Sequence, residues 1–493
     1  MLISRIGNEV LKDSAPIAGK NHFMAATYRL SRLDEMLMNH SLLSGCTPGC
    51  IPIIPVIESE FATWLERQDE PLRRWLNATG FKAKPGGFSL VSGADGQLRA
   101  VVAGIGNTND LWALGNLPVT LPEGDYVLDA PFESRHLERL TLGWALGAYQ
   151  FTRYKSPKRT TARLALDSTC DGDRIRRHAE AVGLVRDLVN TPAEDMMPEH
   201  LAEAMLALGW EFGASVEQIA GDDLLAQNYP VIHAVGRASA HPPRLLDLRW
   251  GDLAHPKVTL VGKGVCFDSG GLDLKPSSAM RLMKKDMGGA ATALGLARLV
   301  MSMGLRVLVA AVDNAVAGNA FRPGDVIRSR QGSTIEIHNT DAEGRLILCD
   351  ALAEAGSEHL AVLIDFATLT GAARVALGTD MPALFCNDDT LATGLLAMAE
   401  REQDPIWRLP LHQPYREMLD SKIADLANAS DSSYAGAITA ALFLKEFVPA
   451  GVPWAHLDLM AWNLKNQPGR PEGGEAMGLR AAFAWLDQQF GGN

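Results

Sequence analysis

From about residue 258 onward, short strand-like runs alternate with longer helical runs, and this alternation limits the fold more than any other feature of the chain. The strand-like runs are short and β-branched or apolar: Val258–Val261, Val307–Val312, Ile335–His338 and Val362–Phe366. The runs with helical spacing and length are Gly289–Met303, Glu343–Ala355 and Thr390–Glu402. This pattern predicts an α/β domain with a mixed, mostly parallel sheet between helices. Ligands then bind beyond the carboxyl ends of the strands, so the residues just after Val261 and His338 are candidates for a site.

The first part of the chain predicts a smaller, separate α/β unit. It has extended stretches at Gly87–Leu90 and Leu98–Ile105, followed by an amphipathic helix at Ser134–Tyr154. The basic, turn-prone stretch Lys155–Arg159 comes next and marks the boundary. A second helix, Arg174–Asn190, should end before Thr191-Pro192, because a residue preceding proline is pushed out of the helical region.

A chain of 493 residues is too long for one ordinary core. We therefore expect an N-terminal domain at residues 1–170 and a larger C-terminal domain at 171–493, with 171–190 as the connecting helix.

Composition excludes several classes of protein. Apolar residues make up 47% of the chain and charged residues 21%, as in a soluble globular protein. The net charge of −12 makes nucleic acid a poor partner, because phosphate backbones need a basic surface. The first residues lack a signal-peptide pattern, no apolar run of about 18 residues occurs, and the six cysteines do not form a disulfide framework. We expect a cytoplasmic protein without a membrane segment.

Acidic and basic residues gather at three junctions of the predicted sheet. The stretch after Val261 predicts a glycine-rich loop that contains Lys263, Asp268, Asp273 and Lys275. Two later junctions contain Asp286, at the entrance of a helix, and the string Asn339-Thr-Asp-Ala-Glu-Gly-Arg345. If the fold is as predicted, these junctions converge on one sheet edge.

Each junction also has a purely structural explanation. Asp286 could be a helix N-cap, Thr340 and Glu343 fit a capping box, and Asp268-Ser-Gly-Gly could be a plain turn. Arg345 argues against the capping box alone, because a cation in the first turn opposes the helix dipole and indicates a nearby anion.

If Asp268, Asp286, Asp341 and Glu343 meet in a partly buried place, their charges require compensation. Two divalent ions would balance them, and carboxylate ligands with few imidazoles suit Mn, Mg or Zn without choosing among them. A lysine coordinates a metal only when neutral, so either Lys263 or Lys275 could be a ligand while the other stays charged and stabilises oxygen charge.

With these residues in place, the chain resembles the leucyl aminopeptidase family, also called cytosol aminopeptidases, from about Arg186 to the C-terminus. The most specific string is Asn339-Thr-Asp-Ala-Glu-Gly-Arg-Leu346. Further strings stand in the family's order and spacing: Val261-Gly-Lys-Gly, Phe267-Asp-Ser-Gly-Gly, Lys275-Pro, Asp286-Met-Gly-Gly-Ala, Arg322-Pro-Gly-Asp325 and Ala367-Thr-Leu-Thr-Gly371.

The resemblance implies a two-metal aminopeptidase with a bridging water. One metal would be held by Lys263, Asp268, Asp286 and Glu343, and the other by Asp268, Asp341 and Glu343. Lys275 would polarise the scissile carbonyl, and Arg345 would hold a bicarbonate that relays protons. A free substrate amine would bind one metal, which explains cleavage at an unblocked N-terminus.

The same resemblance implies a pocket for the first side chain near Met283, Thr368, Leu369 and Gly371. An apolar pocket favours leucine-like residues, but a methylene contributes only about 1 to 3 kcal/mol, so we expect broad specificity. The family also implies a homohexamer. The stretch Ser430–Gly436 departs from the glycine-rich, charged loop of many relatives, and the region before Arg186 matches weakly.

Three other classes of protein compete with this interpretation. A serine hydrolase would use Asp268-Ser269-Gly270-Gly271, but Phe267 stands where its loop needs glycine, and that loop belongs to a β-barrel. A phosphate-binding loop at Gly262-Lys263-Gly264 lacks the following Ser or Thr. A non-enzymatic binding protein would be expected to lack some metal positions, all of which are filled here.

Overall fold

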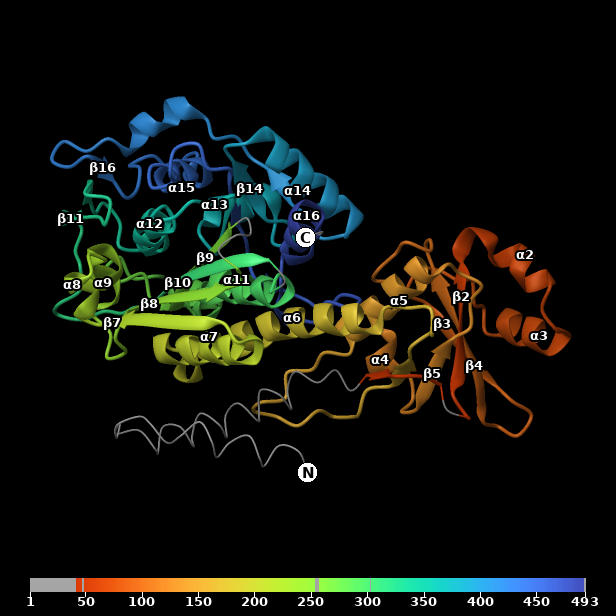
Figure 1. Ribbon diagram of the computed structural model, residues 1–493. Coiled ribbons are helices and arrows are strands. Elements are labelled where there is room, and N and C mark those ends of the chain that lie inside the picture. The colour runs from red at the N-terminus through yellow and green to blue at the C-terminus, as the bar shows by residue number, and fades with distance from the viewer. Residues whose placement is uncertain (1–40, 47, 253–256, 302, 492–493) are drawn as a thin grey trace. The chain divides into compact units, whose positions relative to one another are not determined.

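The larger sheet has eight strands, in the order β15-β14-β17-β13-β9-β10-β8-β7 (Figure 1). The computed structural model describes residues 41–46, 48–252, 257–301 and 303–491. The strands of this sheet are β7 (Ser215–Ala220), β8 (Arg244–Trp250), β9 (Lys257–Asp268), β10 (Gly304–Asn314), β13 (Val362–Ala367), β14 (Ala383–Cys386), β15 (Trp407–Arg408) and β17 (Trp454–Asp458). The central strands β10, β9, β13 and β17 run parallel, whereas β8, β7 and β14 join in antiparallel pairs. The predicted mixed, mostly parallel sheet is therefore confirmed.

Helices cover both faces of this sheet. The residue Gly262 in β9 faces α11 (Gly288–Leu299), because a Cβ there would lie 2.5 Å from Ala290 Cα. Its neighbour Lys263 faces α12 (Glu343–Ala355), where it contacts Gly344. Successive residues of a strand point to opposite faces, so α11 and α12 lie on opposite sides of the sheet. The glycine allows α11 to approach the strand closely.

Other helices pack in the larger, C-terminal part of the chain. They are α6 (Gly172–Asn190), α7 (Pro198–Phe212), α8 (Asp223–Ala226), α9 (Pro230–Gly236), α10 (Ser277–Met280), α13 (Gly371–Leu377), α14 (Asp389–Arg401), α15 (Gly436–Lys445) and α16 (Leu479–Phe490). The described residues also form four 3-10 helices: η1 (Glu58–Glu60), η2 (Ala193–Asp195), η3 (Met283–Met287) and η4 (Gln413–Leu419). Helix α6 ends at Asn190, as the Thr191-Pro192 pair predicts. Among the described residues, no helix is long and apolar enough to cross a membrane.

A six-stranded sheet, in the order β1-β6-β5-β2-β4-β3, forms the smaller α/β unit. Its strands are β1 (Leu42–Leu43), β2 (Ile51–Ile57), β3 (Phe88–Ser92), β4 (Leu98–Ile105), β5 (Asp125–Leu128) and β6 (Arg163–Ala165). Its helices are α2 (Phe61–Glu66), α3 (Glu70–Ala78), α4 (Leu117–Thr120) and α5 (Ser134–Gly147). The prediction of a helix reaching Tyr154 was wrong, because α5 ends at Gly147.

Two predictions about the site's position need correction. Strand β9 continues to Asp268, so Lys263 lies inside a buried strand and not in a loop. The predicted strand at Ile335 is β12 (Thr334–Glu336), which lies outside the large sheet, between β11 (Val326–Arg328) and β16 (Leu426–Ala427). Tertiary pairing, which a short apolar run does not encode, decides which sheet a strand such as β12 joins.

A further two-stranded sheet pairs β18 (Trp462–Asn463) with β19 (Gly473–Gly474).

Candidate active site

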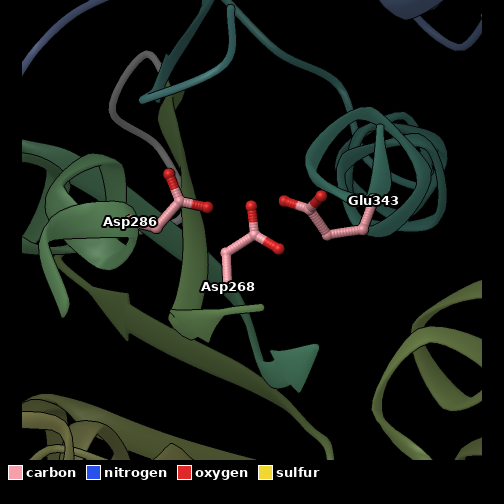
Figure 2. A group of neighbouring side chains, drawn as sticks. All are labelled: Asp268, Asp286 and Glu343. Carbon is pink, nitrogen blue, oxygen red and sulfur yellow. The ribbon is translucent and has the colours of Figure 1, made fainter. Parts of the chain in front are cut away.

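Three buried carboxylates from separate elements turn toward one shared space (Figure 2). Asp268 ends β9, Asp286 lies in η3, and Glu343 begins α12. Each residue is no more than 2% exposed, and one oxygen from each lies within 4.8 Å of the others. The structure thus brings together three of the four carboxylates that the sequence singled out.

Asp268 is held in place by the turn that follows it. Gly270 and Gly271 have φ angles of +90° and +64°, which residues with side chains rarely adopt. The Asp268 Oδ1 atom accepts hydrogen bonds from Gly270 N at 2.8 Å and from Asn314 Nδ2 at 2.9 Å. The tight turn therefore fixes the direction of the carboxylate.

Asp286 and Glu343 do not act as helix caps. The N-cap of α11 is Met287 and that of α12 is Ala342, and neither makes a side-chain cap hydrogen bond. The Asp286 Oδ1 atom instead accepts a hydrogen bond of 2.7 Å from Thr368 Oγ1. The capping explanations of these junctions are therefore wrong, which leaves both carboxylates directed at the shared space.

Two lysines neutralise part of this negative charge. Lys263 Nζ lies 2.7 Å from Asp286 Oδ2 and 3.1 Å from Glu343 Oε1. Lys275 Nζ lies 2.7 Å from Asp268 Oδ2 and also forms an ion pair with Asp341. Asp341, the fourth predicted carboxylate, is only partly buried and joins the group through Lys275.

The electrostatics of the group favour bound cations. Burial and the charge of Asp268 raise the pKa of Glu343 to about 8 and that of Asp341 to about 6. Burial alone would lower the pKa of Lys263, but the surrounding carboxylates raise it above its ordinary value. Beside carboxylates that bind no metal, Lys263 is therefore protonated. It can become a metal ligand only where bound cations neutralise these carboxylates and let the lysine lose its proton.

The donor set fits divalent metal ions. Within the part of the chain that the structure describes, Glu343 Oε2 is buried without a hydrogen-bond partner. Such an atom costs free energy unless another group satisfies it. Several carboxylate oxygens and one amine are suitable ligands for hard or borderline divalent ions.

Arg345 lies in the first turn of α12 and is buried. Its Nη1 atom donates a hydrogen bond of 2.8 Å to Asn428 O, and its Nε atom has no partner among the residues described here. Burial lowers its pKa to about 10, so it keeps its positive charge at neutral pH. A buried cation with a free donor is suited to binding a small anion.

The four predicted pocket residues lie on two segments, one of which also carries Asp286. Met283 begins η3, and Thr368, Leu369 and Gly371 follow β13. Thr368 links the two segments through its hydrogen bond to Asp286. A separate cavity of about 560 Å³, lined by residues including Trp250, Lys257 and Arg306, lies at the opposite end of β9 and has no part in this site.

Two asparagines that no sequence motif indicated also support the site. Asn314 donates to Asp268 Oδ1 and to Thr340 O, and Asn428 contacts the segment that carries Asp341 and Glu343. Neither belongs to a motif that the sequence singled out, because each reaches the site through tertiary contacts.

Comparison with known proteins agrees with this geometry. Residues 183–483 match the catalytic domain of the cytosol aminopeptidase family, and residues 51–167 match the M17 aminopeptidase N-terminal domain. The protein is therefore a hydrolase of the leucyl aminopeptidase type. The chain belongs to the cytosol aminopeptidase family.

The similarity to known relatives and solved structures extends over most of the chain. A probable cytosol aminopeptidase from Syntrophotalea carbinolica is 41% identical over 71% of this chain and 74% of its own length. Peptidase B from Pectobacterium carotovorum is 43% identical over 67% of this chain and 80% of its own. The crystal structure of a cytosol aminopeptidase from Coxiella burnetii has a TM-score of 0.88 and 48% identity, covering 91% of this chain and 99% of that chain. The bottromycin maturation enzyme BotP in complex with Mn has a TM-score of 0.80 and 34% identity, covering 89% and 99% respectively.

Proposed function

We propose that this protein is a metal-dependent aminopeptidase that hydrolyses the N-terminal residue of peptides with two divalent metal ions. The main support is the buried group Asp268, Asp286 and Glu343, whose oxygens lie within 4.8 Å of one another. Two neighbouring lysines and an unpartnered Glu343 oxygen in the described chain indicate a site that binds cations.

One ion would be held by Lys263, Asp268, Asp286 and Glu343, and the other by Asp268, Asp341 and Glu343. When bound, such a pair of ions supplies Lewis acidity and an activated water at neutral pH. The residues do not distinguish Mn from Zn or Mg. The manganese in the BotP structure supports Mn as the first ion to test.

Lys275 and Arg345 carry the remaining chemistry. Carboxylates outweigh the effect of burial and raise the pKa of Lys275, so its ammonium persists and can donate to the substrate carbonyl oxygen. The Nε atom of Arg345 has no hydrogen-bond partner among the described atoms. It would hold a bicarbonate that accepts and returns protons. Lys275 therefore stabilises developing charge, and Arg345 holds the proton carrier.

Two parts of the site would select the substrate: the carboxylate group and the pocket residues. The carboxylate group and its ions would bind a free amine, so only peptides with an unblocked N-terminus are substrates. Met283, Thr368, Leu369 and Gly371 would border the first side chain, favouring leucine-like residues but tolerating others.

The family relationship also supports proposals about the whole protein. We propose a cytoplasmic homohexamer whose substrates are peptides and which has no membrane or nucleic-acid partner. We further propose the domain division at residues 1–170 and 171–493, with 171–190 connecting the two.

The serine-hydrolase alternative has little geometric support. The Ser269 hydroxyl donates to Asn314 O at 2.5 Å and accepts a hydrogen bond from Gly271 N at 3.2 Å. These bonds give Ser269 a role in the turn after β9. A nucleophilic serine would instead have its hydroxyl bonded to a general base.

Hydrolysis of leucine p-nitroanilide, compared with its N-acetylated form, tests the proposed function. We expect cleavage of the free-amine substrate alone, loss of that activity with a chelator, and recovery with Mn or Zn. Chelator-resistant cleavage would indicate Ser269 chemistry and contradict the proposal. Cleavage of the acetylated substrate would contradict the requirement for a free amine.

A further inference from the structure

Asn428 is a fully buried amide next to the segment that carries Asp341, Glu343 and Arg345. It directly follows β16 and has 0% exposure. A buried amide must find hydrogen-bond partners, because an unsatisfied one costs about 1 to 3 kcal/mol. The partners of Asn428 therefore show what this side chain holds.

The side chain of Asn428 bonds both ends of the turn at residues 338–342. Its Oδ1 atom accepts hydrogen bonds from His338 N at 2.8 Å and Asn339 N at 3.2 Å. Its Nδ2 atom donates to Asn339 O at 2.7 Å and to Ala342 O at 3.4 Å. One amide thus fixes the backbone on both sides of Asp341 and just before Glu343.

The main chain of Asn428 is anchored and makes another contact with the site. Its N–H donates to Glu336 O at 2.9 Å, which ties it to β12. Its carbonyl oxygen accepts a hydrogen bond of 2.8 Å from Arg345 Nη1. Asn428 therefore contacts the backbone around two proposed ligands and the side chain of the proposed anion-binding residue.

A second set of bonds holds the opposite side of the same turn. Thr340 Oγ1 donates to Gly270 O at 2.7 Å, and Thr340 N donates to Asp273 Oδ2 at 2.7 Å. These contacts position Thr340 against the loop after Asp268. They do not reach Ala342 or Arg345, the two residues at the start of α12 that Asn428 contacts.

We propose that Asn428 is a positioning residue that sets the orientation of Asp341, Glu343 and Arg345 for metal and anion binding. This inference rests on the proposed function, because it concerns the same site. Groups that orient metal ligands from outside change metal affinity or activity by about 10- to 100-fold when removed. The effect of Asn428 should therefore appear in metal affinity as well as in turnover.

Manganese binding to the full-length Asn428→Ala protein, measured by isothermal titration calorimetry, tests the proposal. We expect affinity for at least one ion to fall by about 10- to 100-fold, with excess manganese restoring part of the lost kcat. The matched control is Asn463→Ala. Asn463 is 2% exposed and donates to Pro471 O and Glu475 Oε2, so its loss should leave manganese affinity unchanged.

Unchanged manganese affinity in a folded Asn428→Ala protein would overturn the proposal. If that variant does not fold, Asn428→Asp decides the question, because it keeps the acceptor for His338 N and Asn339 N and loses the two donated bonds, while its added negative charge would not by itself weaken cation binding. Reduced affinity in Asn428→Asp supports the proposal, and wild-type affinity overturns it. Failure of the wild-type protein to bind manganese, zinc or magnesium would overturn the proposed function together with this inference.

Discussion

Residue 344, between Glu343 and Arg345, is a glycine, and the side chain of Lys263 occupies the space beside it. A Cβ at this position would lie 2.5 Å from Lys263 Cε and 2.7 Å from Lys263 Nζ. These distances are shorter than real Cβ contacts, so the stem of Lys263 needs the space. The path of Lys263 from β9 to Asp286 and Glu343 therefore depends on a glycine that is far away in sequence.

We expect Gly344→Ala to lower kcat/KM by about 100-fold, because displacing a site residue by about 1 Å can have that effect. Alanine is the better helix former by about 1 kcal/mol, so the loss should not come from helix propensity. Gly183→Ala in α6 is the matched control, since a Cβ there would meet no atom of the described residues within 4 Å. Equal kcat/KM for Gly344→Ala and wild type would contradict the proposed position of Lys263.

Asp341→Asn and Glu343→Gln should abolish turnover while leaving the fold intact. Loss of a direct ligand should exceed the about 10- to 100-fold effect of an outer contact. Leucine p-nitroanilide hydrolysis and circular dichroism check the two parts of this prediction. The control is Glu217→Gln on the exposed edge strand β7. Activity retained by the metal-loaded double variant would refute the ligand assignment.

His178 in α6 should make stability depend on pH. Burial lowers its pKa to about 4, compared with an ordinary value of 6.5. Between these values the unfolded chain binds a proton that the folded chain excludes, so stability is lost as pH falls from about 6.5 to 4. The full loss is about 3 kcal/mol. Urea unfolding of wild type and His178→Leu at pH 8 and pH 5 should show about 2 kcal/mol of this loss in the wild type alone, and equal pH dependence in both would show that His178 is not responsible.

At the scale of elements, Asp350 joins α12 to the start of α9. Its Oδ2 atom accepts hydrogen bonds from Val231 N at 2.9 Å and Ile232 N at 3.3 Å. Its Oδ1 atom accepts one from Arg330 N at 2.8 Å. These N–H groups lie at a helix start and in a turn, where the backbone itself supplies no acceptor. One buried carboxylate thus connects three segments behind the active site.

Asp350→Ala should lower the free energy of unfolding by about 3 kcal/mol, because buried N–H groups then lose their acceptor. Urea denaturation measures this change. Glu217→Ala, on an exposed strand, should change stability by no more than about 0.5 kcal/mol. A similarly small change for Asp350→Ala would mean that water or another group satisfies the three N–H groups.

At the scale of the whole molecule, bound metal should stabilise the folded protein. An ion that binds only the folded state adds about 2.7 kcal/mol at a concentration 100 times its Kd. We expect chelation to lower the unfolding temperature by a few degrees, about what that free energy produces. Calorimetry with and without chelator checks this, with Glu343→Gln expected to show a smaller shift. An equal shift in the variant would place the stabilising ion elsewhere.

Hydrophobic periodicity and local motifs in the sequence were enough to predict the main strands, a central helix and the site carboxylates. The runs at Val258, Val307 and Val362 formed the parallel centre of the large sheet, and the predicted helix Glu343–Ala355 was confirmed residue for residue. These elements are long or strongly patterned, so local sequence suffices. Because strand ends of a parallel sheet meet at one edge, the convergence of Asp268 with Asp286 was also predictable.

Only the tertiary structure decided how far β9 extends, which sheet β12 joins and which residues support the site. The extension of β9 to Asp268 placed Lys263 inside a strand, and β12 joined a small sheet with β16. The roles of Gly344, Asn314 and Asn428 also arise from contacts between residues far apart in the chain. Such contacts depend on packing between elements, which a single sequence does not encode in any local period. The sequence by itself therefore determined the family, the fold class and the carboxylates, whereas only the folded chain decided how those carboxylates are held.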